Sequence, residues 1–332
     1  MEFNSNSEFA PIRVIRGLTS VSFVGSAGNL LFAPLRSAHS LAPMSASSKI
    51  ASRFSVGIGS WTDKEYREVL YPKGTPDNER LKTYATWFDH VEVNSSYHRV
   101  PPVAFVENWV KQTPADFIFD FKLPKEISAA PEKAAREGPH VAQLLRAAQP
   151  LIASKKLGAF FLVLPPSFGP DQHRLEELEP IVEKLRPHLL AVELRHSDWI
   201  EGAQREKTFE FYRARKLVWI AVDMPRIKGS TIMPPVDEVT NPRLAYLRLH
   251  GRRKDWLTLN DQEARHSYEY SDAELEEIAT RARALAQKAE KVHVVANNHA
   301  QDFAPKTAKR LQKILGIEKS GPPSATSLLP GF

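Results

Sequence analysis

The chain has 332 residues, enough for one large domain or two ordinary ones, and its proportions of apolar and charged residues are those of a soluble globular protein. It contains no cysteine, which excludes disulfides, zinc–thiolate sites, iron–sulfur clusters and cysteine nucleophiles. The net charge of +6 at pH 7 is too small to indicate a nucleic-acid partner by itself. No apolar run approaches the roughly 20 residues of a membrane span, and we expect a cytoplasmic protein with no membrane partner.

The two ends of the chain lack the pattern of a folded domain. Residues 1–53 are rich in Ser and Ala and show no sustained hydrophobic period. Three interpretations remain open: a start assigned too early, with Met44 as the true start; a targeting segment, because Arg16 and Arg36 flank an uncharged stretch; or a disordered tail. Residues 317–332 are predicted to form a frayed C-terminal tail.

Between these ends, eight short apolar runs are each followed by a helical pattern or a long loop. Eight such units predict a single TIM-like (β/α)8 barrel over residues 54–316. In chain order the runs are Phe54–Trp61, His90–Arg99, Phe117–Pro124, Gly158–Pro165, Leu190–His196, Leu217–Asp223, Leu244–Arg252 and Val292–Asn298.

Two stretches between the runs carry specific signals. Met224–Pro242 has no helical period, so we expect a loop to replace the sixth helix. Ser271, with Glu274 three residues later, has the spacing of a capping box, which predicts the start of a helix after the seventh strand.

Polar residues gather where the apolar runs end and are few where the runs begin. In a (β/α)8 barrel the C-terminal ends of the strands form the mouth, where active sites lie. Glu193 and Arg195 are two residues apart and should share one face of their strand. An ion-pair network that only fixes strand register is the alternative interpretation. The polar residues are Glu92, Asn94, Lys122, Glu193, Arg195, Asp223, Arg248, His250 and Asn297.

Carboxylates and an imidazole together are ligands that Mn²⁺, Mg²⁺ or Zn²⁺ binds. Lys122, Arg195 and Arg248 in the same mouth could instead neutralise the carboxylates without any ion. The candidate catalytic residues, which are also the candidate ligands of a divalent metal, are Glu92, Glu193, Asp223 and His250.

Five segments, in this order along the chain, resemble the YecE-like family, domain of unknown function 72: residues 91–97 (VEVNSSY), 164–168 (LPPSF), 192–196 (VELRH), 246–252 (YLRLHGR) and 297–300 (NNHA). The resemblance covers roughly residues 54–316 and implies a TIM-like barrel, but it supplies no reaction. It implies a polar mouth formed by Glu92, Asn94, Arg99, Lys122, Glu193, Arg195, His196, Asp223, Arg248, His250, Arg252, Asn297 and Asn298.

Arginine and lysine side chains in the mouth suit phosphate or carboxylate groups, and aromatic side chains there could stack on a base or sugar or simply cover the barrel core. We expect a hydrolase or lyase acting on a phosphoester or other anionic substrate, which could be nucleic acid. The alternatives are a carbohydrate-active enzyme using Glu92 and Glu193, and a non-catalytic barrel that binds an anion. The candidate substrate-binding residues are Asn94, Arg99, Lys122, Arg195, Arg248, Arg252, Asn297, Asn298, Trp61 and Tyr97.

Overall fold

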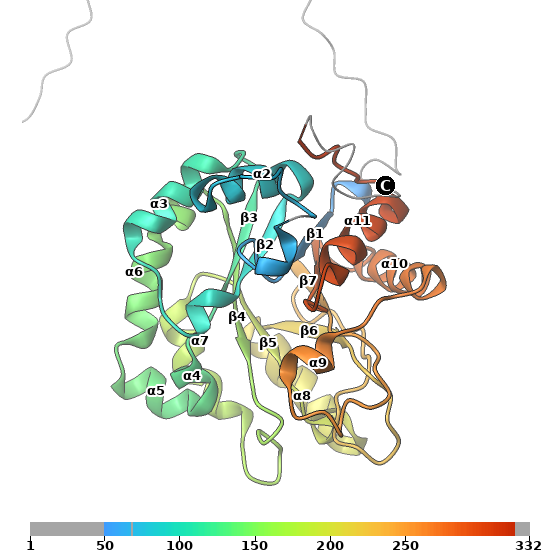
Figure 1. Ribbon diagram of the computed structural model, residues 1–332. Coiled ribbons are helices and arrows are strands. Elements are labelled where there is room, and N and C mark those ends of the chain that lie inside the picture. Colours follow the sequence, from blue (N-terminus) through green and yellow to red (C-terminus); the bar gives the residue numbers. More distant parts are fainter. Residues whose placement is uncertain (1–49, 68, 323–332) are drawn as a thin grey trace, which may run out of the picture. The chain divides into compact units, whose positions relative to one another are not determined.

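The computed structural model describes residues 50–322 except residue 68, so the expectations for residues 1–49 and 323–332 lie outside the described part of the chain. Eight parallel strands pair with their neighbours in chain order, and the last pairs with the first to close a barrel, which confirms the predicted fold (Figure 1). The strands are β1 (Phe54–Ile58), β2 (His90–Val93), β3 (Ile118–Lys122), β4 (Leu157–Val163), β5 (Leu190–Glu193), β6 (Val218–Asp223), β7 (Leu244–Leu249) and β8 (Lys291–Ala296).

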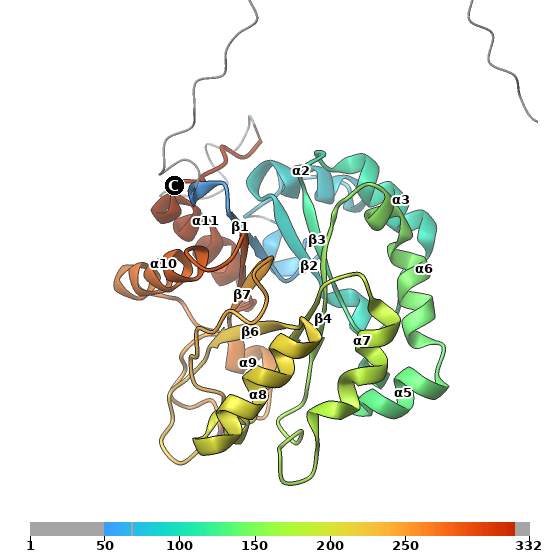
Figure 2. The ribbon, with the colours of Figure 1, turned by 180° about the vertical axis from the view of Figure 1, so that it is seen from behind.

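Helices follow most of the strands and cover the outside of the barrel. Figures 1 and 2 show α3 beside α6 and α10 beside α11, so neighbouring units share their helical cover. The helices are α2 (Arg80–Trp87), α3 (Val103–Gln112), α4 (Lys125–Ala129), α5 (Pro131–Glu137), α6 (His140–Ala153), α7 (Glu179–Leu185), α8 (Gly202–Arg215), α9 (Gln262–His266), α10 (Asp272–Ala286) and α11 (Phe303–Leu315). None of the helices in the described residues is both long and apolar enough to cross a lipid bilayer.

The local signals read from the sequence are found where they were expected. None of residues 224–243 is helical, so a loop joins β6 to β7 in place of the sixth helix. At the start of α10 the Glu274 backbone N–H donates to Ser271 Oγ (3.3 Å), and the Ser271 N–H donates to the Glu274 carboxylate (2.8 Å). This capping box satisfies two backbone donors that would otherwise have no partner.

The folded unit extends slightly beyond residues 54–316 at both ends. Arg53 Nη1 donates to the Ala286 carbonyl oxygen (2.6 Å), and Lys309 Nζ donates to the Lys319 carbonyl oxygen (2.6 Å). Gly321 packs so closely on Trp87 that an added Cβ would lie 2.4 Å from the indole ring. The residues next to the predicted boundaries therefore contact the barrel.

An irregularity in the sheet places a carboxylate inside the lower half of the barrel. Along β3 and β4, Phe119 pairs with Leu157 but Phe121 pairs with Phe160, so the register shifts around Asp120. The Asp120 Oδ1 atom accepts the Ala159 backbone N–H (2.8 Å) next to this shift in register. Asp120 thus has a structural role in the sheet itself.

Candidate functional site

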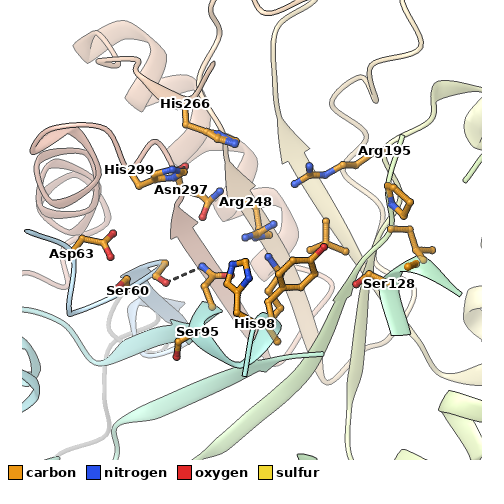
Figure 3. A pocket seen from close by; sticks show the side chains of 18 of the residues that line it. Ser60, Asp63, Ser95, His98, Ser128, Arg195, Arg248, His266, Asn297 and His299 are labelled. Carbon is orange, nitrogen blue, oxygen red and sulfur yellow. Dashed lines mark hydrogen bonds between the residues drawn. The ribbon is translucent and has the colours of Figure 1, made fainter. Parts of the chain in front are cut away.

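A pocket of about 570 Å³ opens at the mouth of the barrel. Residues at or just after the ends of β1, β2, β3, β4, β5, β7 and β8 border it, as expected for the C-terminal end of this fold (Figure 3). Its volume suits a small molecule. We refer to it as the mouth pocket.

The floor of the mouth pocket is an arginine held between two carboxylates. Arg248 donates through Nε and Nη2 to the two oxygens of Glu92 (2.8 and 2.9 Å) and through Nη1 to Glu193 (2.5 Å). All three side chains are at most 1% exposed. Tyr246 adds a hydroxyl that donates to Glu92 (2.9 Å). We call Glu92, Glu193 and Arg248 the mouth cluster.

The Glu193 carboxylate contacts two arginines, Arg248 and Arg195, and one neutral histidine, His250. Arg195 Nε donates to Glu193 Oε1 (2.7 Å), so the two side chains share one face, as their spacing predicted. His250 lies between Glu193 (3.3 Å from Nε2) and the side-chain amide of Asn297 (3.2 Å from Nδ1). Because the amide N–H donates to Nδ1, the proton of the neutral ring lies on Nε2 and points at Glu193. Burial lowers the pKa of His250, which favours this neutral form.

Glu193 remains ionised in this environment. Burial alone would raise its pKa, but Arg248, His250 and Arg195 together hold the pKa well below its usual range. A carboxyl group of this kind is a poor proton donor near pH 7, because a general acid needs a raised pKa. The mouth cluster is therefore suited to positioning its arginines rather than to giving a proton to a substrate.

Two cationic groups remain available above this floor. Arg195 uses only Nε for its bond to Glu193, and its two terminal nitrogens have no hydrogen-bond partner among the described residues. Figure 3 shows the Arg195 guanidinium reaching into the pocket toward Arg248. The side-chain amine of Lys122, at the end of β3, forms no hydrogen bond or ion pair with the described residues and lies 4.5 Å from the centre of the Tyr97 ring. Burial, and then the nearby Arg248 and Arg195, lower the pKa of Lys122 to about 7.

Two asparagines and a glycine complete the inner side of the pocket. Asn94 donates to the Gly59 carbonyl oxygen (2.8 Å) and approaches Glu92 (3.4 Å). A Cβ on Gly59 would lie 2.7 Å from the Asn94 amide and 2.9 Å from the Asn297 amide. The absence of a side chain at this position lets both amides reach the pocket.

Histidines that the sequence analysis did not select line another side of the pocket. His266, in α9, lies with its ring 5.3 Å from that of His250 and 4.9 Å from that of His299. Burial, and then the neighbouring histidines and arginines, lower the pKa of His266, so its ring is neutral. His266 lies in a polar stretch between the seventh strand and α10, and only the folded chain shows that it reaches the mouth. Ser60, Asp63, Ser95 and His98 are further pocket residues that the sequence did not select (Figure 3).

Three of the predicted site residues make their contacts away from the mouth pocket. Asp223 accepts two hydrogen bonds from Arg252 (2.7 Å each), one from Arg281 (2.7 Å) and one from the Tyr270 hydroxyl (2.9 Å). The prediction that Asp223 and Arg252 belong to the mouth is therefore wrong. Both are fixed in an ion-pair cluster with α10.

Asn298, the third of these residues, anchors the chain before α11. Its amide donates to the Tyr268 carbonyl oxygen (2.8 Å) and to Thr307 Oγ1 (3.0 Å), so it does not border the mouth pocket. This corrects the prediction that Asn298 binds substrate.

Two further candidates do not reach the mouth pocket. Trp61 is only 8% exposed and packs edge-on against Trp109, with ring centres 5.1 Å apart, so it covers the core. Arg99 is exposed and borders a separate surface hollow with Pro101 and His140. Of the two aromatic candidates for substrate binding, only Tyr97 borders the mouth pocket.

The predicted metal site is not formed. In residues 50–322 apart from residue 68, the only set of three His, Asp or Glu side chains with ligand atoms within 4.8 Å of one another is His90, Asp120 and His293. Arg248 lies between Glu92 and Glu193, and Asp223 is turned outward, so the predicted ligands do not converge. The arginines neutralise these carboxylates without an ion.

His90, Asp120 and His293 form a second buried cluster nearer the strand starts, which we call the base cluster. Asp120 Oδ2 accepts hydrogen bonds from His90 Nε2 (2.6 Å) and His293 Nδ1 (2.8 Å). Burial alone would raise the pKa of Asp120, but the two histidines lower it. Polar residues are few at the strand starts of the sequence, and this cluster was not among the predicted site residues. Hydrogen bonds account for its arrangement.

The fold and the mouth pocket define a (β/α)8-barrel protein with an arginine- and lysine-lined mouth. Residues 55–330 match the family model described as "Protein of unknown function DUF72", and the chain belongs to this family. This confirms the resemblance seen in the sequence.

Relatives and solved structures agree with this assignment. The UPF0759 protein YunF of Bacillus subtilis is 27% identical over 80% of this chain and 96% of its own length. The UPF0759 protein YecE of Escherichia coli K12 is 32% identical over 39% of this chain and 46% of its own length. A crystal structure of a DUF72 family protein from Enterococcus faecalis V583 has a TM-score of 0.72 and 28% identity, over 79% of this chain and 95% of the other. One from Thermotoga maritima MSB8 has a TM-score of 0.69 and 28% identity, over 79% and 99%.

Proposed function

We propose that this protein is an enzyme that acts on a small substrate carrying a phosphate or carboxylate group, and that the mouth pocket is its active site. The observation that carries the proposal is that two cationic side chains in the pocket, Arg195 and Lys122, are not fully paired with the carboxylates of the mouth cluster. Arg195 presents two unpaired nitrogens and Lys122 an unpaired amine to the same pocket. Arginine terminal nitrogens suit planar or tetrahedral oxyanions.

The charge balance of the mouth supports an anionic substrate. At the floor of the pocket Glu92 and Glu193 offset Arg248 and Arg195, so protonated Lys122 adds a positive charge beside these paired groups. The further carboxylate of the pocket, Asp63, lies on the side of His299 (Figure 3). A bound anion would supply the missing negative charge and raise the pKa of the Lys122 amine from its value of about 7. In the protein without ligand, the pKa of about 7 lets Lys122 take up or release a proton near neutral pH, which is what general acid–base catalysis requires.

Among the reactions considered from the sequence, these features favour a lyase or a metal-independent hydrolase. Metal-assisted cleavage of a phosphoester loses support because the proposed ligands do not converge. Glycoside hydrolysis by Glu92 and Glu193 loses support because both side chains are fully buried, are held by Arg248 and do not border the mouth pocket, so neither can reach a glycosidic bond. The size of the pocket favours a small molecule over a polymer such as nucleic acid.

Calorimetry with inorganic phosphate, citrate and pyruvate tests the anion site. We expect at least one of these anions to bind the wild type, and Arg195→Gln to weaken it by about tenfold, the loss expected for one charge-assisted pair of hydrogen bonds. Arg226→Gln is the matched control, because Arg226 is exposed and pairs with Glu277 (3.2 Å) outside the pocket. Equal affinity of both variants for every anion would contradict the proposal.

A further inference from the structure

Three lysines in the described part of the chain have side-chain pKa values that burial lowers, and one of them differs from the others. Lys156 Nζ donates to the Thr113 carbonyl oxygen (2.8 Å), and Lys309 Nζ donates to the Lys319 carbonyl oxygen (2.6 Å). Lys122 borders the mouth pocket, and its amine has no hydrogen-bond acceptor among the described residues. Lys156 and Lys309 are thus structural, whereas the Lys122 amine is accessible to a ligand.

Arg195 borders the same pocket as Lys122 and provides a second cationic group. Its Nε is fixed by Glu193 (2.7 Å), which is itself held by Arg248 (2.5 Å). The two terminal nitrogens of Arg195 are therefore positioned before a ligand arrives and can donate two hydrogen bonds to a carboxylate. The pocket thus offers a fixed guanidinium and an unpaired amine to one small molecule.

We propose that Lys122 forms a Schiff base with the carbonyl carbon of a 2-oxo acid whose carboxylate is bound by Arg195. The inference rests on the proposed function and deepens it by naming the class of substrate. In a 2-oxo acid the carbonyl carbon is directly bonded to the carboxylate. A carboxylate bound by Arg195 therefore keeps the electrophilic carbon within the same pocket as the amine.

The covalent step needs no reagent other than the two reactants and a proton. The lone pair of the neutral Lys122 amine attacks the carbonyl carbon, a C–N bond forms and the carbonyl oxygen takes up a proton. The resulting hydroxyl group leaves as water after a second protonation, while one amine proton is lost and the nitrogen lone pair forms the C=N bond. The product is a protonated imine, which can accept electrons from a bond broken next to the former carbonyl carbon. This is the chemistry of a lyase.

The environment of Lys122 favours the neutral amine that this step needs. Burial and the neighbouring arginines lower its pKa to about 7, whereas an exposed lysine near 10.4 is almost entirely protonated at neutral pH. Lysine nucleophiles are activated in this way by desolvation or by an adjacent cationic group.

Reductive trapping tests the inference on the full chain. Purified protein is incubated with pyruvate and sodium cyanoborohydride, and the modified residue is located by peptide mass mapping. We expect one added group with the mass of pyruvate less one oxygen atom, attached to Lys122. Lys156 provides the internal control of a buried but hydrogen-bonded lysine. Acetone, which lacks the carboxylate, should label Lys122 at least about tenfold more slowly because it has no group for Arg195 to bind.

Two variants and a pH series make the test decisive. Lys122→Arg keeps the charge and should abolish the specific label, and Arg195→Gln should slow it. At pyruvate concentrations too low to saturate the site, labelling of Lys122 relative to Nα-acetyl-lysine should reach half its maximum near pH 7, the pKa of the amine in the protein without ligand. If Lys122→Arg does not fold, the wild-type peptide map and Arg195→Gln decide the question.

Label spread over exposed lysines and unchanged in both variants would overturn the Schiff base. If pyruvate or phosphate still bound in an Arg195-dependent manner, the proposed anion site would survive that result. If no anion bound, both proposals would fail.

Discussion

The base cluster and the mouth cluster occupy the two halves of one barrel interior, and they have much in common. Each is buried, each contains ionisable groups from at least three strands, and each borders or underlies a pocket, of about 620 Å³ at the base and about 570 Å³ at the mouth. They differ in what remains after their internal bonds are made. In the base cluster Asp120 accepts from both histidines, so its carboxylate is fully used within the protein, although His90 Nδ1 is buried without a partner among the described residues.

At the mouth, by contrast, the two carboxylates use up Arg248 and one nitrogen of Arg195, and leave the rest of Arg195 and all of Lys122 unpaired. Buried charge by itself therefore does not identify a functional site in this barrel. The informative feature is charge that the protein does not neutralise and that an open pocket makes accessible. Four substitutions test this difference.

The largest change in the free energy of unfolding should come from a substitution in the base cluster. Asp120→Ala removes the acceptor of two imidazoles and of the Ala159 N–H. We expect the free energy of unfolding to fall by about 3–5 kcal/mol, as for other buried pairs that lose one partner. Urea denaturation at pH 7 measures it. Anion affinity per folded molecule should not change, and a loss below about 1 kcal/mol would show that the base cluster is not structural.

A smaller loss of the free energy of unfolding is expected for Glu193→Gln in the mouth cluster. Arg248 keeps its two bonds to Glu92, and the glutamine oxygen can still accept one hydrogen bond, so we expect a loss of about 1.5–3 kcal/mol. Because Glu193 fixes Arg195, anion binding should also weaken. Calorimetry and urea denaturation on the same variant measure both effects. Intact anion binding in a destabilised protein would mean that Glu193 stabilises the fold without positioning Arg195.

Lys122→Met should stabilise the protein, with a defined dependence on pH. The native pKa of Lys122 is about 7, below its ordinary value of 10.5, so between these values the unfolded chain binds more protons and wild-type stability rises with pH. Below pH 7 Lys122 is protonated in both the folded and the unfolded chain, so burying its charge lowers the stability of the wild type by the full amount. We expect a gain of about 1–2 kcal/mol at pH 6, less than the whole shift implies because the pocket is open to water.

The gain from Lys122→Met should shrink as the pH rises from 7 toward 10.5. Thermal unfolding at pH 6, 8 and 10 measures this trend, and Lys122→Arg serves as the control that keeps the charge. A gain that did not vary with pH would show that better apolar packing, rather than removal of a charge, stabilises the variant.

The smallest effect on stability should come from Arg195→Gln. In this variant the buried Glu193 keeps its bonds to Arg248 and His250, and only the single bond from Arg195 is changed, so the free energy of unfolding should fall by about 1 kcal/mol or less. Anion affinity should nevertheless fall, which separates binding from folding. A large loss of stability here would place Arg195 with the structural residues and remove the contrast between the two clusters.

Much of the fold could be predicted because it depends on local patterns. Eight apolar runs with polar ends indicate eight barrel strands, and Met224–Pro242 lacks the period of a helix. Ser271 and Glu274 form a cap through neighbouring backbone atoms. Glu193 and Arg195 share a face because alternate residues of a strand point the same way. In each case the interacting groups are close in sequence.

The tertiary structure alone decided which polar residues meet. Barrel strands are buried on both faces and show no alternation of apolar and polar residues, so the sequence does not reveal which face is internal. Glu193 and Asp223 both end a strand, yet Glu193 faces the interior and Asp223 faces α10. Likewise, the sequence does not show that Asn297 borders the mouth pocket whereas Asn298 is bonded to Tyr268 outside it.

Pairs far apart along the chain also depended on barrel closure. Glu92 binds Arg248 across 156 positions, and no local pattern specifies that partner. The closed sheet brings them together, and the resulting pairing determines that Lys122 and part of Arg195 remain available. The sequence by itself determined the barrel and the end at which its polar residues gather, whereas folding determined which of those charges are neutralised.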